Sequence, residues 1–197
     1  LPEVPRLPRQ ATGSPPAAPP LDPTVLRAGE AQRLIHALPP GRTRDYVSFA
    51  YETGLRPATI FRLRTPTHWA PGRRTLRITP DVDKARFARE LPLTAAARAV
   101  LERVEPTIRG ALFARRDLVL EELHETSERV LGRRVGLYDL RHSRITLLVE
   151  AGGPLTGVQY LAGHKHLSTT ARYAHAGLSA AEEALGALRG PGPRRRR

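Results

Sequence analysis

Hydrophobic positions in most of the middle of the chain recur with the 3.6-residue period of an α-helix. Between residues 27 and 38, for example, Leu34, Ile35 and Leu38 fall on one helical face. Helices are predicted in residues 27–38, 44–53, 94–104, 117–131, 139–151 and 179–189, with short helices after residue 56 and in residues 156–163 and 168–175. The protein is therefore expected to have a mainly helical core.

Local signals predict where two of these helices begin and end. Thr43 is expected to be the N-cap of the second helix, because a threonine hydroxyl accepts a hydrogen bond from the first turn. Gly54 is expected to end the same helix, since glycine tolerates the left-handed conformation found at helix ends. Pro57 suits the first turn of the short third helix, where no N–H is needed.

Residues 68–93 follow the two-residue period of β-strands instead. A hairpin is predicted around a Pro71-Gly72 turn, because residues 75–79 alternate polar and apolar side chains after it. The segment FARELPL, residues 87–93, is expected to form a third strand, with Lys84 in the connection between the second and third strands. The predicted fold class is mainly α with a small antiparallel β-sheet (α+β).

Composition divides the chain into three parts. Residues 1–23 hold 8 of the 19 prolines and are predicted to be a linker or a disordered arm. Residues 24–190 are expected to form one domain, and residues 191–197, which end in four arginines, a basic disordered tail. Because the chain starts at Leu1 and not at methionine, an excised domain or a processed chain is expected.

The charge of the chain points to a polyanionic partner. Lys and Arg number 32 against 19 Asp and Glu, which gives a formal net charge of +13. Such an excess is typical of nucleic-acid binding, and a membrane surface is the alternative. The sequence holds no apolar run near the roughly 18 residues of a spanning helix and no signal-peptide core. A cytoplasmic protein that binds nucleic acid is therefore expected.

Several kinds of catalytic site are excluded because the sequence lacks the residue types or motifs that they need. The chain has no cysteine, which rules out disulfides and thiolate zinc sites. Neither a glycine-rich nucleotide loop nor a Gly-x-Ser-x-Gly turn occurs. His164, His166 and His175 lie close together in sequence, but their spacing does not suit a helical metal pair, and no carboxylate occurs in residues 155–181. No metal or other cofactor is expected.

A tyrosine could instead attack a DNA phosphodiester. This reaction places negative charge on the nonbridging oxygens of the phosphorus, and the planar fork of arginine can bind two such oxygens at once. The leaving 5′ oxygen also needs a proton, which a lysine in a hairpin turn could donate. The residues to look for are therefore arginines, a lysine and a tyrosine.

Two segments resemble the tyrosine recombinases, the phage integrase family. TGLRPATIFRLR, from Thr53, resembles the first arginine box of the family, and YDLRHSRITLLVEAGGPLTGVQYLAGHKHLSTTARYAH, from Tyr138, is similar to the second. The family has its nucleophilic tyrosine nine residues after a Gly-His histidine, and His164 and Tyr173 have this separation. The resemblance covers residues 26–188 and implies the integrase catalytic-domain fold.

The resemblance implies catalytic roles for five residues. Arg56 and Arg141 match the two arginines that clamp the scissile phosphate, and His164 matches a histidine that donates to it. Lys84 matches the hairpin lysine that protonates the leaving oxygen. Tyr173 matches the nucleophile, which forms a 3′-phosphotyrosyl bond and frees a 5′ hydroxyl.

Three more residues are expected to contact DNA. Arg89 matches a common basic position of the third strand, His166 follows His164 closely, and Arg172 precedes Tyr173. These contacts are implied by the resemblance and by position along the chain.

Two positions depart from the family pattern. Tyr138 stands where the family has a histidine or a lysine, and a phenol can donate one hydrogen bond to phosphate but does not titrate near neutral pH. Thr59 stands where the family favours an acidic residue that helps to orient the site. The family pattern therefore assigns no residue of this chain to orient Arg56 in place of that carboxylate.

The resemblance implies a site-specific recombinase that cleaves and rejoins DNA without a cofactor, because the phosphotyrosyl link conserves the bond energy. It also implies double-stranded DNA as the partner, a tetramer on DNA, a monomer when free and a core-binding domain upstream. Two alternatives are open. One is DNA relaxation of the type IB topoisomerase kind, and the other is a noncatalytic DNA-binding relative, which Tyr138 and Thr59 would favour.

Overall fold

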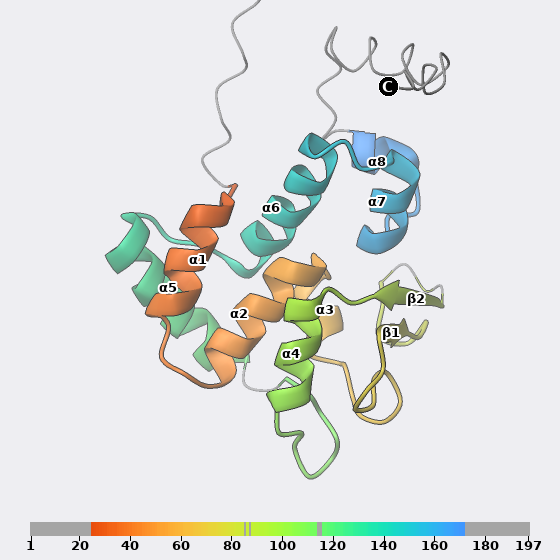
Figure 1. Cartoon of the computed structure of the whole chain (residues 1–197), viewed down its shortest axis with the longest axis horizontal. Coiled ribbons are helices and arrows are strands. Elements are labelled where there is room, and N and C mark those ends of the chain that lie inside the picture. Colours follow the sequence, from red (N-terminus) through yellow and green to blue (C-terminus); the bar gives the residue numbers. More distant parts are fainter. Residues whose placement is uncertain (1–24, 85, 87, 114–115, 172–197) are drawn as a thin grey trace, which may run out of the picture.

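The computed structural model describes residues 25–84, 86, 88–113 and 116–171. Within them the chain forms eight helices and a two-stranded antiparallel sheet (Figure 1). In chain order the elements are α1 Ala28–Ala37, α2 Arg42–Thr53, α3 Pro57–Ile60, β1 Thr75–Ile78, β2 Arg89–Pro92, α4 Ala95–Arg103, α5 Arg116–Leu131, α6 Leu137–Glu150, α7 Leu155–Ala162 and α8 Leu167–Ala171. The predicted fold class is confirmed.

Helix α2 is the centre of the helical core. It contacts α1, α4, α5 and α6, and the side chains of Tyr46, Val47 and Phe49 on it are fully buried. The Tyr46 ring stacks on Phe61, which follows α3, with 4.6 Å between the ring centroids. Each large apolar side chain buried in this way contributes about 1.5 to 3 kcal/mol. This packing fixes the direction in which the chain leaves α2.

The start of α2 differs from the prediction. The helix begins at Arg42 with Gly41 as its N-cap, so Thr43 lies in the first turn and is not the cap. Gly41 has a φ of 140°, a conformation that favours glycine and lets the helix begin earlier. The Thr43 side chain is buried, 5% exposed, and is used for packing.

The end of α2 agrees with the prediction. Gly54 adopts the left-handed conformation, with a φ of 62°, and its N–H donates to the carbonyl of Ala50 at 2.9 Å. Pro57 is the first residue of α3, as its fixed φ favours. Three residues, Gly54, Leu55 and Arg56, therefore form a short corner between the two helices.

The sheet has two strands in the described residues and not three. Strands β1 and β2 pair antiparallel, with Thr75 opposite Pro92 and Ile78 opposite Arg89. The segment that contains Lys84 connects them, as predicted. The strand predicted before the Pro71-Gly72 turn does not form, so that prediction was wrong.

The turn itself is present, and its surroundings explain the missing strand. The N–H of Arg73 donates to the carbonyl of Ala70 at 3.1 Å across Pro71 and Gly72. Pro66 and Pro71 lie on either side of residues 67–70 and have no backbone donor, which opposes a β-ladder there. A backbone bond from the N–H of Arg77 to the carbonyl of His68 at 2.8 Å still joins this segment to β1. The buried Trp69 instead closes the loop, because its indole Nε1 donates to the carbonyl of Arg73 at 3.1 Å.

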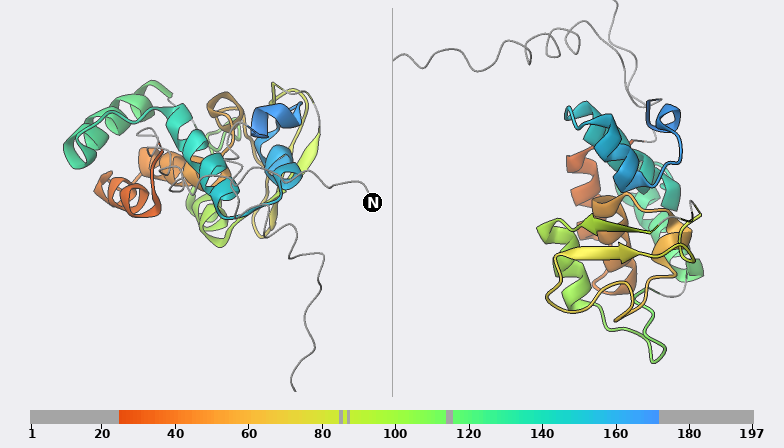
Figure 2. Two further views of the ribbon diagram at one scale, coloured as in Figure 1. Left: turned by 90° about the horizontal axis from the view of Figure 1, so that it is seen from above. Right: turned by 90° about the vertical axis from the view of Figure 1, so that its right-hand side faces the viewer.

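Helices α6 and α7 follow α5, and α7 is attached to the sheet. Helix α6 begins two residues earlier than predicted, where the N–H of Gly136 donates to Asp139 Oδ2 at 2.7 Å. Helix α7 lies beside the edge of the sheet that β2 forms (Figure 2, right). The Tyr160 hydroxyl donates to the carbonyl of Glu90 at 3.1 Å and accepts from its N–H at 3.3 Å, which attaches α7 to β2.

Several predictions fall outside the described residues. Helix α8 covers the start of the helix predicted in residues 168–175, but its continuation, the helix predicted in residues 179–189 and both terminal segments lie outside. The part of the chain that the structure describes has no helix that is long and apolar enough to cross a membrane.

Candidate active site

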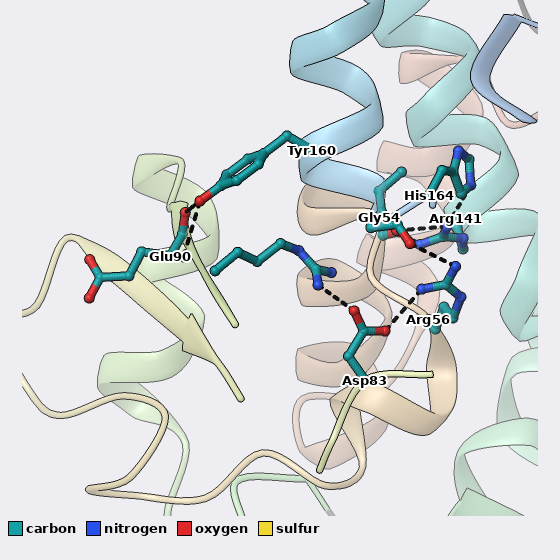
Figure 3. Close-up of polar contacts among 10 residues, drawn as sticks. Gly54, Arg56, Asp83, Glu90, Arg141, Tyr160 and His164 are labelled. Carbon is teal, nitrogen blue, oxygen red and sulfur yellow. Dashed lines mark hydrogen bonds and ion pairs between the residues drawn. The ribbon is translucent and has the colours of Figure 1, made fainter. Parts of the chain in front are cut away.

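Arg56 lies at the corner between α2 and α3 and joins three segments that are far apart in sequence. Its Nη1 donates to Asp83 Oδ1 at 2.9 Å, and its Nη2 donates to the carbonyl of Gly163 at 2.9 Å. Figure 3 shows this guanidinium between the Asp83 carboxylate and the end of α7. The side chain is 20% exposed, so it is fixed by the protein and still accessible to a ligand.

Arg141, from the second turn of α6, lies beside Arg56 and is 7% exposed. Its Nη1 donates to the carbonyl of Gly54 at 2.7 Å, and its Nη2 donates to the carbonyl of Ala162 at 2.9 Å. The same Nη2 lies 2.9 Å from His164 Nε2. The planar fork of the guanidinium therefore connects the end of α2 with the end of α7 (Figure 3).

The contact with Arg141 determines the protonation of His164. An arginine can only donate, so Nε2 of His164 accepts, and the neutral imidazole carries its proton on Nδ1. Nδ1 then donates to the hydroxyl of Thr170 at 2.9 Å. His164 is 8% exposed, and bonds on both ring nitrogens hold its orientation.

Asp83 lies between two arginines. Its side chain is fully buried, with Oδ1 on Arg56 and Oδ2 on Nη1 of Arg89. The Arg89 side chain is 1% exposed. In this arrangement the guanidinium of Arg89, which was expected to contact DNA, faces the protein interior and holds Asp83.

Lys84 and Tyr138 lie on a surface cavity of about 670 Å³ next to this cluster. Arg56, Arg62 and Arg86 also line it, and so do the carboxylates of Asp81 and Asp83, which leaves the cations in excess. Lys84 is exposed, and Tyr138 is 60% exposed. Cationic groups around an open cavity provide a binding place for a phosphate anion.

A buried histidine supports the turn that holds Asp83 and Lys84. The N–H of Arg64 donates to Nδ1 of His68 at 2.9 Å, so the neutral ring donates from Nε2 to the Thr79 hydroxyl at 3.0 Å. Burial lowers the pKa of His68, which keeps the ring neutral at pH 7. Thr79 directly follows β1, and this bond therefore fixes the start of the turn.

The structure brings together some of the site residues that were predicted from the two motifs. Arg56, Arg141 and His164 converge at the ends of α2 and α7, and Lys84 and Tyr138 lie on the adjoining cavity. In the described residues no group of three or more His, Cys, Asp or Glu side chains could hold a metal ion.

Two predicted site residues lie outside the described residues, namely Arg172 and the proposed nucleophile Tyr173. His166 is exposed in the turn before α8. The roles of these three residues stay predictions.

Asp83 was not predicted from the sequence. An acidic residue in a turn gives no signal of its own, because most such residues are solvated. The signal that could have found it is the uncharged Thr59, which leaves the partly exposed Arg56 without the acidic residue that the family pattern has three positions after it. Asp83, 27 residues after Arg56, supplies that carboxylate.

Replacing Gly163 by alanine is expected to lower the free energy of unfolding by about 2 kcal/mol. Gly163 has a φ of 65°, and a Cβ there would lie 2.4 Å from Nη2 of Arg89. Gly157→Ala, in the middle of α7 with open space around it, is the matched control and should raise stability by up to about 1 kcal/mol. Urea unfolding measures both, and equal effects of the two variants would contradict the packing described for Gly163.

Comparison with known proteins places this arrangement in a family. The Phage integrase family matches residues 24–179. The tyrosine recombinase XerC of Mycobacterium sp. (strain KMS) is 33% identical over 178 residues, which cover 78% of this chain and 58% of XerC. The catalytic domain of bacteriophage HP1 integrase has a TM-score of 0.65 at 22% identity, covering 86% of this chain and 98% of that domain. XerH recombinase bound to its difH substrate has a TM-score of 0.66 at 23% identity, covering 84% of this chain and 55% of XerH.

A helical domain with a small sheet is a fold that this chain shares with the catalytic domain of HP1 integrase. The chain belongs to the phage integrase family, which confirms the resemblance seen in its two motifs. It spans 58% of the length of the XerC relative.

Proposed function

We propose that this chain is the catalytic domain of a site-specific DNA recombinase, which cleaves and rejoins strands through a 3′-phosphotyrosyl intermediate. The convergence of Arg56, Arg141 and His164 beside the cavity that holds Lys84 is the observation that supports the proposal most strongly. Two guanidinium groups and an ammonium supply the positive charge that attack on a phosphodiester requires. Nε2 of His164 accepts from Arg141 and Nδ1 donates to Thr170, so we propose that His164 acts by holding Arg141 in place.

In the proposed reaction, the hydroxyl of Tyr173 loses its proton to water, its oxygen attacks the scissile phosphorus, and the bond from phosphorus to the 5′ oxygen breaks. Arg56 and Arg141 stabilise the charge that develops on the nonbridging oxygens. The ammonium of Lys84 donates its proton to the leaving 5′ oxygen, so that a 5′ hydroxyl forms. Attack by a 5′ hydroxyl on the phosphotyrosyl bond reverses these steps and rejoins the DNA.

The other tyrosines narrow the choice of nucleophile. Tyr46 and Tyr51 are buried, and burial raises the pKa of both phenols, which opposes their ionisation. The hydroxyl of Tyr160 is bonded to the backbone of Glu90. Of the five tyrosines, Tyr138 and Tyr173 are left as candidates, and the spacing from His164 favours Tyr173.

Double-stranded DNA is the proposed substrate. The net charge of +13 favours phosphate contacts, whose affinity falls steeply with salt. Arg62 and Arg86, beside Arg56 and Lys84, extend the cationic surface of the cavity, and Tyr138 could donate to a phosphate there. We propose direct DNA contacts for His166 and Arg172, and for Arg89 a supporting contact through Asp83.

The assembly follows from the same proposal. A recombinase must hold two sites at once, so we propose a tetramer on DNA, a monomer when free and a core-binding domain upstream that helps to encircle the duplex. The proposed place of action is the cytoplasm.

The test is covalent capture of DNA. The protein is mixed with a library of nicked DNA duplexes that have random sequences on both sides of the cleavage site, in a buffer with EDTA. Cleavage near the nick releases a short fragment that diffuses away, so the strand cannot be rejoined and the covalent adduct accumulates. A protein–DNA adduct that resists denaturant is expected, and sequencing of the captured strands identifies a preferred duplex. Tight binding to the library without any adduct would contradict the proposal and would favour a noncatalytic relative. Relaxation of supercoiled DNA by the free monomer would favour the topoisomerase reaction.

A further inference from the structure

The buried carboxylate of Asp83 is the feature from which a further role can be inferred. Each of its two oxygens accepts from a different guanidinium, Oδ1 from Arg56 and Oδ2 from Arg89. Its side chain has no exposed surface, whereas that of Arg56 is 20% exposed. The carboxylate therefore faces the inner side of Arg56, and the exposed part of Arg56 is available to the substrate.

The contacts of Arg56 leave it little freedom to turn. Asp83 holds Nη1 on one side, and the carbonyl of Gly163 holds Nη2 on the other. Gly163 directly precedes His164, and Arg89, the second partner of Asp83, packs against Gly163. Asp83 thus connects the orientation of Arg56 with the position of the loop that carries His164.

The charges around Asp83 show why a carboxylate is needed at this place. Arg56 and Arg89 both approach the same carboxylate, and two cations this close repel one another in a buried setting. Thr59, in the single turn of α3 that follows Arg56, lines the same cavity but carries no charge. The negative charge comes from the turn between β1 and β2 instead.

Asp83 also precedes Lys84 in the chain. The carbonyl of Asp83 accepts from the N–H of Arg86 at 2.9 Å, which closes a tight turn around Lys84. Because the Asp83 side chain is anchored in the interior, the backbone of the exposed Lys84 starts from a fixed point.

We propose that Asp83 is the positioning residue of this site, which orients Arg56 and the Lys84 turn toward the scissile phosphate and takes the place of a carboxylate at Thr59. This inference rests on the proposed DNA cleavage. It assigns no contact between Asp83 and DNA. The predicted effect of losing Asp83 therefore depends on the charge of the phosphate that Arg56 must bind.

The test compares two substrates in each variant. Adduct formation is timed on the captured duplex with a normal scissile phosphate and on the same duplex with a methylphosphonate there, which lacks the negative charge. Asp83→Asn is expected to slow cleavage of the phosphate by about 100-fold, because a displaced arginine no longer meets the developing charge. Cleavage of the methylphosphonate should slow by less than about 10-fold, since less charge has to be stabilised. The ratio of the two rates is taken on one protein sample, so it does not depend on the folded fraction.

Two further variants complete the design. Glu122→Gln removes one negative charge from an exposed position on α5, outside the cavity, and should leave both rates within about twofold of wild type. Adding Thr59→Glu to Asp83→Asn returns a carboxylate to the cavity wall and should recover at least about 10-fold of the lost rate on phosphate. Equal slowing of Asp83→Asn on both substrates, or no recovery in the double variant, would overturn the inference about Asp83. The proposed function would still stand in that case, because the wild type cleaves the DNA. A wild type that forms no adduct would refute the proposed function and this inference with it.

Discussion

Replacing Arg141 by lysine is expected to slow DNA cleavage by at least about 100-fold and to lower the free energy of unfolding by about 2 to 4 kcal/mol. Arg141 is buried and uses two nitrogens to bond the carbonyls of Gly54 and Ala162. Lysine has one nitrogen and no fork, so it cannot satisfy both carbonyls and His164 together. The rate of adduct formation and urea unfolding measure the two effects.

Arg144→Lys is the matched control for this prediction. Arg144 lies on the same helix and is partly exposed, and its pairing with Glu52 is loose, with 3.7 Å between Nη2 and Oε2. A pair of this kind contributes at most about 1 kcal/mol. If Arg141→Lys changed stability and cleavage no more than Arg144→Lys does, the central place given to Arg141 would be wrong.

Replacing Tyr173 by phenylalanine should lower covalent adduct formation by at least about 10⁴-fold, because it removes the attacking oxygen itself. Salt-dependent binding to duplex DNA should be unchanged, since the cations that provide it are intact. A denaturing gel measures the adduct, and a mobility shift at several salt concentrations measures the binding.

The control for Tyr173→Phe is Tyr160→Phe. This change removes the hydroxyl that bonds the carbonyl and the N–H of Glu90, and it should lower the free energy of unfolding by about 1 kcal/mol. Its adduct yield at a temperature well below unfolding should match wild type. Loss of the adduct in both variants would mean that removing a tyrosine hydroxyl abolishes cleavage by disturbing the structure, and it would contradict the role of Tyr173 as nucleophile.

Most helices could be predicted from the sequence, because their apolar periods and terminal residues are local signals. Gly54 and Pro57 fixed the corner that carries Arg56, and the structure has both where they were expected. The sheet was harder. The first predicted strand is absent because of tertiary contacts that no local pattern shows. Strand β1 pairs with β2, which begins 14 residues after β1 begins, and Trp69 closes the loop that precedes β1.

The site could be predicted as a set of residues but not as a set of contacts. Motif spacing brought Arg56, Arg141 and His164 together, yet it could not show that Nε2 of His164 accepts from Arg141. Asp83 and Arg89 form a buried ion pair between positions that have no sequence pattern in common. Burial and charge pairing of this kind depend on the folded chain and are not readable from local spacing.

The most direct test of the central claim is to map the attachment point of the captured DNA. The adduct is digested with protease and nuclease, and mass spectrometry identifies the residue that carries the nucleotide and the end of the strand to which it is joined. The account predicts a 3′ phosphate on Tyr173 and no adduct from Tyr173→Phe. A nucleotide on Tyr138, or an adduct that persists in Tyr173→Phe, would contradict it.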